Sequence, residues 1–410
     1  MRLTRDPRYR WVVAGMAFFA VLAAIGFGRF GYSAVLPSMQ EDLGISSAAA
    51  GSLASWNQVG YTVMALVGGI LASRFGARVV VTVGLLVTAI GMLLTGLAQG
   101  LAMASAARLL TGMGNGMVLA PSLALMAAWF EPARLGAASG IVPAGSSLAL
   151  VVVGPLVPAL LDAGGADGWR LVWYVFAAVT LLVALLTVAV LRDRPYRERH
   201  MTLGRLRAAE MRAIVRSGHA WLLGLIYFLY GFAFLLFFTF FQKLLTTDLG
   251  YSDETAGTLF LILGATGVAS GVLWGRVSDG IGRGRTLAIV LLVEAAVALV
   301  FALWHSIAAL VVGSAVFGLC GLSVPALLGA ACGDKYGARL AAASLGFVTA
   351  FVGIGQIIGP YVGGALEDAY GSLVPSYLVA AGVFAAAAAV SLLLRDKRPV
   401  MHAAHTSSEP

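Results

Sequence analysis

Charge and cysteine are both scarce in this chain of 410 residues. Only 11% of its residues are charged, whereas 60% are hydrophobic and the mean hydropathy is +0.91. A soluble globular chain is nearer to half apolar and a quarter charged. This scarcity of charge excludes an ordinary soluble protein and indicates a chain that lies in a lipid bilayer. Cys320 and Cys332 lie in or beside apolar segments without ligand-type spacing, so we expect neither a disulfide framework nor a metal site.

The motifs of common enzymes are also lacking. The sequence contains no HExxH zinc motif, no P-loop and no set of nucleophile, histidine and acid that would support catalysis. We therefore expect no enzymatic activity and no cofactor. The five histidines all fall in loops, in tails or at the ends of apolar segments: His200, His219, His305, His402 and His405.

The chain has instead a series of long apolar runs. A helix needs about 20 apolar residues to cross a bilayer, and a segment in lipid must pair its own backbone groups, as an α-helix does. The first run follows a basic N-terminus but is too long for the core of a signal peptide, so we interpret it as a retained span. The sequence predicts an all-α membrane protein with twelve transmembrane helices, at about 11–36, 49–72, 79–98, 102–129, 138–161, 170–191, 220–241, 256–275, 286–304, 308–330, 343–366 and 375–394.

The basic residues indicate how these helices cross the membrane. If the N-terminus lies in the cytoplasm, all but four of the 27 Lys and Arg residues fall in cytoplasmic segments, as the positive-inside rule requires. The net charge of +8 is therefore a topology signal, and we expect contact with membrane lipid and none with nucleic acid. We predict a multi-pass protein of the cell inner membrane with both termini in the cytoplasm. The four exceptions lie within spans or at their outer ends: Arg29, Arg108, Arg170 and Lys243.

An internal repeat divides the chain into two parallel halves of six helices. Gly154-Pro155 matches Gly359-Pro360, and four further matches follow the same order at an offset of about 205 residues. Such repeats occur in secondary transporters, whose halves expose a midplane site alternately to each side. An arginine-rich connector, which we expect to be partly helical and to lie at the anionic lipid surface, joins the halves. The predicted domains are a six-helix bundle at 1–191, the connector at 192–219, a second six-helix bundle at 220–398 and a cytoplasmic tail at 399–410.

Several motifs resemble those of a known superfamily of transporters. Residues 69–78 resemble the loop motif G-x-L-x-D-R-x-G-R-R, with Ser73 and Ala77 in place of the usual Asp and Arg, whereas a second copy at 275–283 keeps the acid at Asp279. Residues 108–114 resemble the span-four motif R-x-x-x-G-x-G, and residues 145–155 resemble the motif of span five. On these motifs the whole chain resembles a member of the major facilitator superfamily. The GFGRFGY segment at 26–32 is similar to one bacterial branch of it.

Four charged residues lie at the predicted cytoplasmic ends of helices, namely Arg74, Arg78, Asp279 and Arg283. Their charges can pair with one another and with helix termini, and would latch an inner gate in one state. Because Ser73 carries no charge, this interpretation is stronger for the second copy of the motif. Anchoring by the positive-inside rule is the alternative.

Glycine and proline mark two spans that correspond in the halves. Gly145, Gly154 and Gly359 permit close approach of helices, and Pro155 and Pro360 bend a helix. We expect these spans to flex and to pack where the halves meet. The resemblance associates the first of them with exchangers, although helix packing alone also explains these residues.

Three ionisable residues lie inside predicted spans, where a charge costs a few kcal/mol. Arg29 has no local acid and shares a helix face with Tyr32, so we predict that its guanidinium contacts an anionic substrate; the alternative is a side chain that snorkels to the outer headgroups. Arg108 begins span four near the outer surface, with Asn115 two turns along the same face, and either acts in coupling or gating or anchors the outer interface. Glu294 is either a proton carrier or a neutral acid bonded to a neighbouring helix.

The resemblance places spans one, four, seven and ten around a central cavity, and these spans contain no Asp or Glu at mid-depth. The field in such a cavity is positive and favours small organic anions. Neutral polar side chains would complete the site by fixing the orientation of a ligand, or would simply bond helices together. The predicted substrate-binding residues are Arg29, Tyr32, Asn57, Gln58, Tyr61, Asn115, Tyr227, Tyr230 and Gln356.

We therefore predict a monomeric secondary transporter of a small organic anion, a carboxylate or similar, that works by alternating access, with a proton as the candidate coupled ion. One alternative is an exporter of hydrophobic or drug-like compounds, whose pocket would be lined by the phenylalanines of span seven. Another is a membrane-embedded enzyme or a sensor that moves no solute. The phenylalanines in question are Phe232, Phe234, Phe238 and Phe241.

Overall fold

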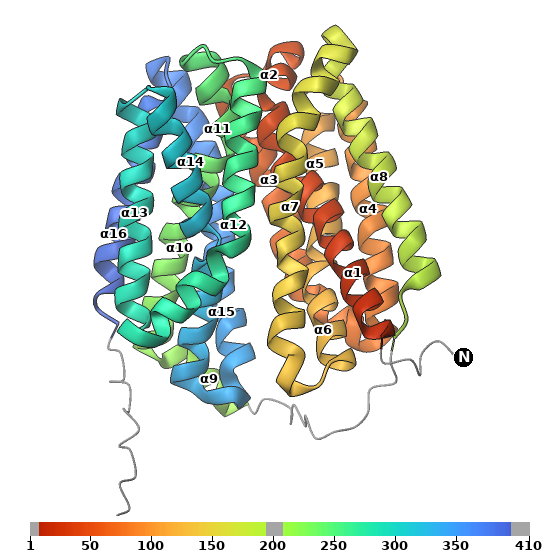
Figure 1. Cartoon of the computed structure of the whole chain (residues 1–410), viewed down its shortest axis with the longest axis vertical. Helices are drawn as coiled ribbons and strands as arrows, with labels where there is room; N and C mark the ends of the chain where they lie inside the picture. Colours follow the sequence, from red (N-terminus) through yellow and green to blue (C-terminus); the bar gives the residue numbers. More distant parts are fainter. Residues whose placement is uncertain (1–7, 194–207, 395–410) are drawn as a thin grey trace, which may run out of the picture.

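The computed structural model describes residues 8–193 and 208–394, and almost all of them are helical (Figure 1). Most of the predicted connector and the predicted tail at 399–410 lie outside the described residues. From the connector, the structure describes a short helix, α9, at Ala208–Arg216.

The first half of the chain forms one group of helices, called here the first bundle. Its first span is continuous from Tyr9 to Leu43, longer at both ends than predicted, and contains a π-helical segment in its middle. The elements are α1 (Tyr9–Val21), η2 (Leu22–Phe30), α2 (Gly31–Leu43), α3 (Ser47–Phe75), α4 (Ala77–Gly96), α5 (Leu101–Gly116), α6 (Leu119–Trp129), α7 (Pro132–Gly164), η3 (Gly165–Asp167) and α8 (Gly168–Val190).

The second half forms a similar group, called the second bundle. Its longest element, α15, joins the end of span ten to span eleven, and the backbone leaves helical geometry at Gly337, where φ is 70°. The elements are α10 (Gly218–Thr239), α11 (Phe241–Lys243), η4 (Leu244–Asp248), α12 (Asp253–Ile281), α13 (Arg283–Leu303), α14 (Ile307–Gly321), α15 (Val324–Tyr370) and α16 (Val374–Ser391).

The described part of the chain contains twelve membrane spans, as predicted. Ten segments are long and apolar enough by length and hydropathy, and one of them, Arg134–Val190, contains both α7 and α8. The remaining span is α3, whose 29 residues are long enough to cross a bilayer although its sequence is more polar. The prediction of an all-α membrane protein built from two six-helix repeats is confirmed.

Matching elements of the two bundles begin and end with the same local chemistry. The side chains of Ser46 and Ser252 cap α3 and α12, each accepting an amide hydrogen bond of 3.2 Å. Both helices then end at a glycine with positive φ, Gly76 at 88° and Gly282 at 97°, where a residue with a Cβ would be strained. The internal repeat thus extends to helix caps and turns.

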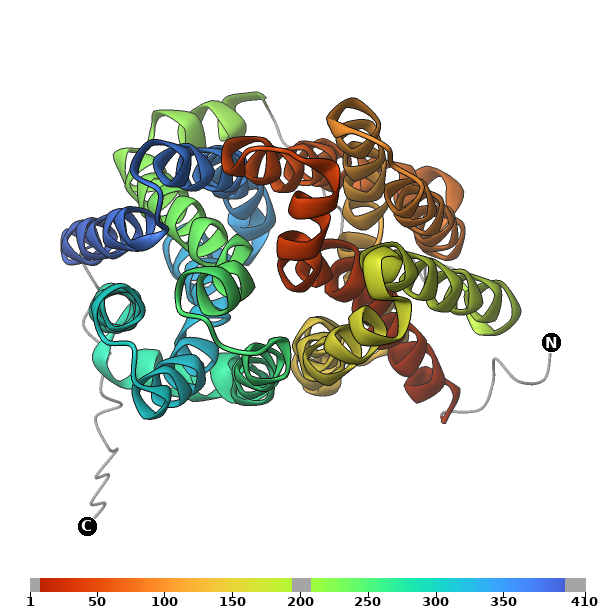
Figure 2. The same cartoon turned by 90° about the horizontal axis from the view of Figure 1, so that it is seen from above.

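The two bundles lie side by side and meet along two helix pairs, α3 with α15 and α7 with α12 (Figure 2). They converge toward the end that carries α11, called the α11 end, and diverge toward the opposite α9 end (Figure 1). Glycines allow this approach, because a Cβ on Gly51 would collide with the backbone of Pro360, and one on Gly154 with that of Gly257. The domain boundaries at 191 and 220 stay a prediction.

Candidate functional site

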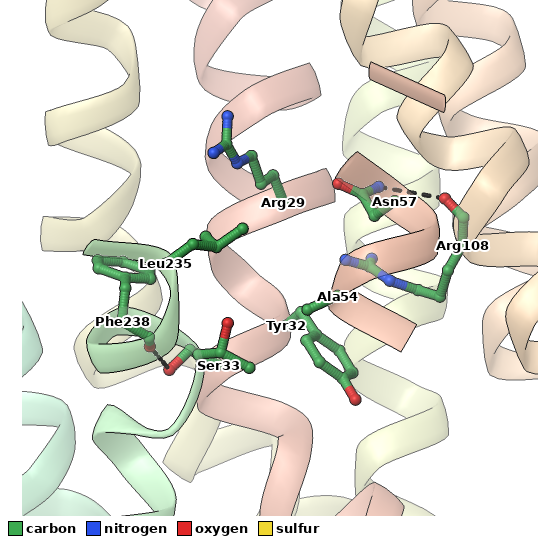
Figure 3. Close-up of a pocket in the computed structure, with 9 residues that line it drawn as sticks. Arg29, Tyr32, Ser33, Ala54, Asn57, Arg108, Leu235 and Phe238 are labelled. Atoms are coloured by element: carbon green, nitrogen blue, oxygen red, sulfur yellow. Dashed lines mark hydrogen bonds between the residues drawn. The ribbon is translucent and has the colours of Figure 1, made fainter. Parts of the chain in front are cut away.

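A small cavity of about 10 Å³, room for little more than one water molecule, lies between the bundles in the interior of the molecule (Figure 3). Spans one, two and four of the first bundle and α10 of the second contribute to its wall. Two of its lining residues are arginines and none is acidic. The lining residues are Arg29, Tyr32, Ser33, Ala54, Asn57, Arg108, Leu235, Phe238 and Thr239.

Arg29 is presented by the π-helical segment η2 and is half-buried. π-helical insertions often mark functional positions because the wider turn re-aims the side chains around it. The guanidinium lies over the rings of Phe30 and Tyr61, at 5.3 and 5.2 Å from their centroids. Its Nε is buried without a hydrogen-bond partner among the described residues, so the planar fork keeps donors for a ligand.

Arg108 is an interior residue of the first bundle, not an anchor at the outer surface. It is 1% exposed, and its Nη1 donates a hydrogen bond of 2.7 Å to the carbonyl of Gly28. Its guanidinium lies 4.6 Å from the ring of Tyr32 and 5.2 Å from that of Trp173. We had placed Arg108 at the beginning of span four near the outer surface. The predicted start of that span agrees with α5, which begins at Leu101, but the side chain of Arg108 packs inside the bundle against span one.

The two arginines make the cavity cationic. Within residues 8–193 and 208–394, no carboxylate lies within ion-pair distance of Arg29 or Arg108, and the two guanidinium groups repel each other. A buried charge without a counter-ion is costly. An anion in the cavity would remove that cost.

Three tyrosines that we expected at a substrate site lie around Arg29. Tyr61, Tyr227 and Tyr230 all lie within electrostatic range of its guanidinium. The rings of Tyr227 and Tyr230 are stacked with centroids 6.0 Å apart, and the Tyr230 hydroxyl donates to the carbonyl of Gly321 at 2.7 Å. The second bundle thus faces Arg29 with aromatic rings.

The predicted amides occupy three kinds of position. Asn57 lines the cavity and donates to the carbonyl of Arg108 at 3.2 Å. Gln58 is 1% exposed and donates to Thr62 at 3.3 Å, while its carbonyl oxygen has no partner in the described part of the chain. Gln356 packs against Gly231, outside the cavity wall.

Asn115 does not face the cavity. Its side chain is fully buried within the first bundle, where the Thr88 hydroxyl lies 3.1 Å from it and Gly28 makes room for it. Asn115 therefore bonds spans one, three and four together, and we leave it out of the proposed site.

The charged residues of the two loop motifs pair within their own bundles. Arg283 contacts Asp279 at 2.7 Å and Asp334 at 2.9 Å, all in the second bundle. In the first bundle, the Nη2 group of Arg78 donates to the carbonyl of Val188 at 2.6 Å. The backbone amide of Arg78 donates to the carboxylate of Asp193 at 3.0 Å. Arg74 is exposed and lies over the ring of its neighbour Phe75. A latch between the bundles by these residues stays a prediction.

The glycine and proline positions divide between two kinds of contact. Gly154 and Pro360 lie where the bundles meet. Gly145 instead packs on the carbonyl of Phe18, and Gly359 on that of Phe232, each inside its own bundle. Pro155 is exposed within α7.

Glu294 is fully buried in α13, and neither of its carboxylate oxygens has a hydrogen-bond partner among the described residues. The bond to a neighbouring helix that we considered for it is absent from that part of the chain. Of the four phenylalanines considered for a hydrophobic pocket in the alternative of an exporter, Phe238 alone lines this cavity. Phe234 and Phe241 pack on Phe317 and Phe301 inside the second bundle.

A cluster of polar residues at the α11 end joins the two bundles and was not predicted from the sequence. We call it the α11-end clamp; it consists of Ser47, Ala48, Lys243, Glu367 and Asp368. The backbone amides of Ser47 and Ala48 donate to the two oxygens of Asp368, at 2.8 and 2.9 Å. Lys243 donates to Ser47 at 2.7 Å and forms an ion pair with Glu367 at 2.6 Å. The one signal in the sequence was Lys243, which departs from the positive-inside rule.

Comparison with known proteins agrees with this architecture. A putative tartrate transporter of Agrobacterium vitis is 25% identical over 397 residues, which cover 90% of each chain. The hexuronate transporter of Bacillus subtilis is 25% identical over 396 residues, with 91% of each chain covered. A probable sulfoacetate transporter of Cupriavidus necator is 24% identical over 266 residues, or 62% of this chain and 61% of that one.

The fold is also that of solved transporters. A bacterial homologue of the human lysosomal transporter Spinster, in an inward-facing and unoccupied conformation, matches with a TM-score of 0.77 and 19% identity, covering 95% of this chain and 97% of the other. The family model described as "Uncharacterised MFS-type transporter YbfB" matches residues 21–392. The chain is a multi-pass membrane protein that belongs to this family of transporters, within the major facilitator superfamily.

Proposed function

We propose that this protein is a secondary active transporter that moves a small organic anion, a carboxylate or a similar group, across the inner membrane by alternating access. The main support for this proposal is the cavity between the bundles, where Arg29 and Arg108 have no acidic partner in the described part of the chain. A guanidinium presents paired donors in the geometry of a carboxylate. The names of the related tartrate, sulfoacetate and hexuronate transporters support the same class of substrate.

The two arginines have different tasks in this proposal. Arg108 is fixed by Gly28 and by two aromatic rings, so it supplies charge from a set position. Arg29 is held by aromatic faces alone, which leaves its donors to the anion. Tyr61, Tyr227 and Tyr230 lie around the guanidinium of Arg29, and in this proposal their rings help to orient it toward the anion. We further propose that the protein acts as a monomer with both termini in the cytoplasm.

Binding and exchange of organic acids test the proposal. Purified protein is screened by thermal shift against L-tartrate, sulfoacetate and D-glucuronate, because a ligand of the folded state raises its apparent stability. The best binder is then followed by exchange in proteoliposomes. Arg29→Ala should remove both the thermal shift and the exchange, and Arg29→Lys should keep a fraction, since lysine retains the charge without the fork.

Arg212→Ala is the matched control. It removes the same charge from the exposed surface of α9 and should leave exchange unchanged. Exchange by Arg29→Ala at the wild-type rate and affinity would refute the anion site. The alternative of a hydrophobic exporter has less support, because Phe234 of α10 and Phe241 of α11 pack on other rings inside the second bundle.

A further inference from the structure

Glu294 is a buried carboxyl group that the anion cavity does not use. It lies in α13 at 0% exposure, and both of its oxygens lack hydrogen-bond partners within the described residues. Its surroundings are apolar: a Cβ on Gly321 would lie 3.0 Å from Oε1, with Phe234 and Phe317 at the same point. A carboxylate enclosed in this way, with neither a cation nor a donor, costs several kcal/mol. A bound proton removes that cost.

Tyr230 connects this carboxyl group to the anion cavity. Its ring lies within electrostatic range of both Glu294 and Arg29, and its hydroxyl is bonded to Gly321, the residue against which Glu294 packs. The same helix, α10, also carries Leu235 and Phe238 of the cavity wall. Arg29 and Glu294 thus act on the same phenol, and we infer that a change of charge at Arg29 would reach Glu294 across the Tyr230 ring through a low-dielectric interior.

We propose that Glu294 is a proton-binding site and that its proton travels with the anion bound at Arg29. This inference rests on the proposed function. The positive charge of Arg29 opposes a proton at Glu294, and an anion at Arg29 cancels that opposition, so each ligand raises the affinity for the other. The proton comes from water on one side, binds a carboxylate oxygen, and returns to water on the other side when the anion leaves. The coupling is symport.

Few other groups can titrate beside Glu294. Tyr230 of α10 and Cys320 of α14 face it, and a phenol and a thiol both stay neutral at acidic to neutral pH. Among the described residues of α12, α15 and α16, no charged group lies against it. A pH dependence that disappears with Glu294 is therefore assignable to this carboxyl group.

The test uses Glu294→Gln, which keeps the shape and removes the proton site, with L-tartrate as the probe. Wild-type protein in liposomes should accumulate tartrate along an inward proton gradient, and its affinity should weaken by about tenfold from acidic to alkaline pH. Glu294→Gln should bind tartrate independently of pH and exchange it in counterflow, yet fail to accumulate it. Glu254→Gln, which removes an exposed acid of α12, should behave as wild type.

Two outcomes overturn the inference: accumulation by Glu294→Gln in response to the gradient, or loss of its counterflow as well, which would mark a purely structural group. If wild type moves none of the organic acids, the proposed function fails instead. Infrared spectroscopy then decides separately, since it needs no substrate. Wild type should show at neutral pH a protonated carboxyl band that Glu294→Gln lacks, and absence of that band from wild type would refute the proton site.

Discussion

At the scale of single residues, the cavity separates charge that is fixed from charge that is free to bind. Arg108 is fixed by a carbonyl and two rings, whereas Arg29 keeps unused donors. The two arginines carry the same charge, but their contacts give them different roles: Arg108 is held in place, and Arg29 is free to bind a ligand.

Substitution by lysine should distinguish the two arginines. Arg108→Lys keeps the charge but loses the planar stacking between Tyr32 and Trp173, which we expect to cost about 2 kcal/mol of stability. Thermal unfolding in detergent should show a lower midpoint for Arg108→Lys and an unchanged one for Arg29→Lys. Equal midpoints for both variants would contradict the structural role of Arg108.

The residues of the site were predictable by type and less so by direction. Arg29 and Asn57 stood out because polar groups are rare in apolar spans. Asn115 looked equivalent, yet it faces the interior of its bundle, because a helix that is apolar on all sides carries no amphipathic signal to orient it. The direction in which such a side chain points depends on how the helices pack, which the sequence of one helix does not show.

At the scale of elements, contacts between glycines set how closely the bundles approach. Gly154 of α7 and Gly257 of α12 bring two backbones into direct contact, which any larger side chain would prevent. The bundles can close at the α11 end only while this contact is possible.

Gly154→Val should therefore hold the bundles apart at that end. We expect at least a tenfold loss of exchange, because about 1.4 kcal/mol between two conformations already changes their ratio tenfold. Gly140→Val is the control on the same helix, since a Cβ at Gly140 meets no atom within 4 Å. Exchange and size-exclusion profiles of both variants should be compared; a similar loss in both would implicate α7 itself rather than the contact.

The spans were predictable at this scale because lipid leaves few alternatives to an apolar helix. The irregular segments within these spans could not be predicted from the sequence. The π-helical turn at Leu22–Phe30 and the break at Gly337 depend on tertiary contacts, which hydropathy does not encode. The structure places Arg29 on the first of these irregular segments.

At the scale of the whole molecule, the α11-end clamp holds one end closed. Asp368 of the second bundle accepts the first two amides of α3, so its charge also faces the positive end of that helix. Neither partner can be recognised from its own bundle alone, since the pairing forms between the two bundles. This is why repeats and motifs predicted two bundles without showing what joins them.

Asp368→Asn should shift the molecule toward opening at the α11 end. The amide retains one acceptor but loses the charge, and we expect a change of about 2 kcal/mol, or roughly 30-fold in the ratio of closed to open forms. Spin labels at Glu41 and Tyr370, exposed residues of the two bundles, would report the separation once both buried cysteines are replaced. The distance distribution should gain a longer component in Asp368→Asn and not in Glu254→Gln. An unchanged distribution would mean that the glycine contacts alone close this end, and that the charged clamp contributes little to the alternation between states.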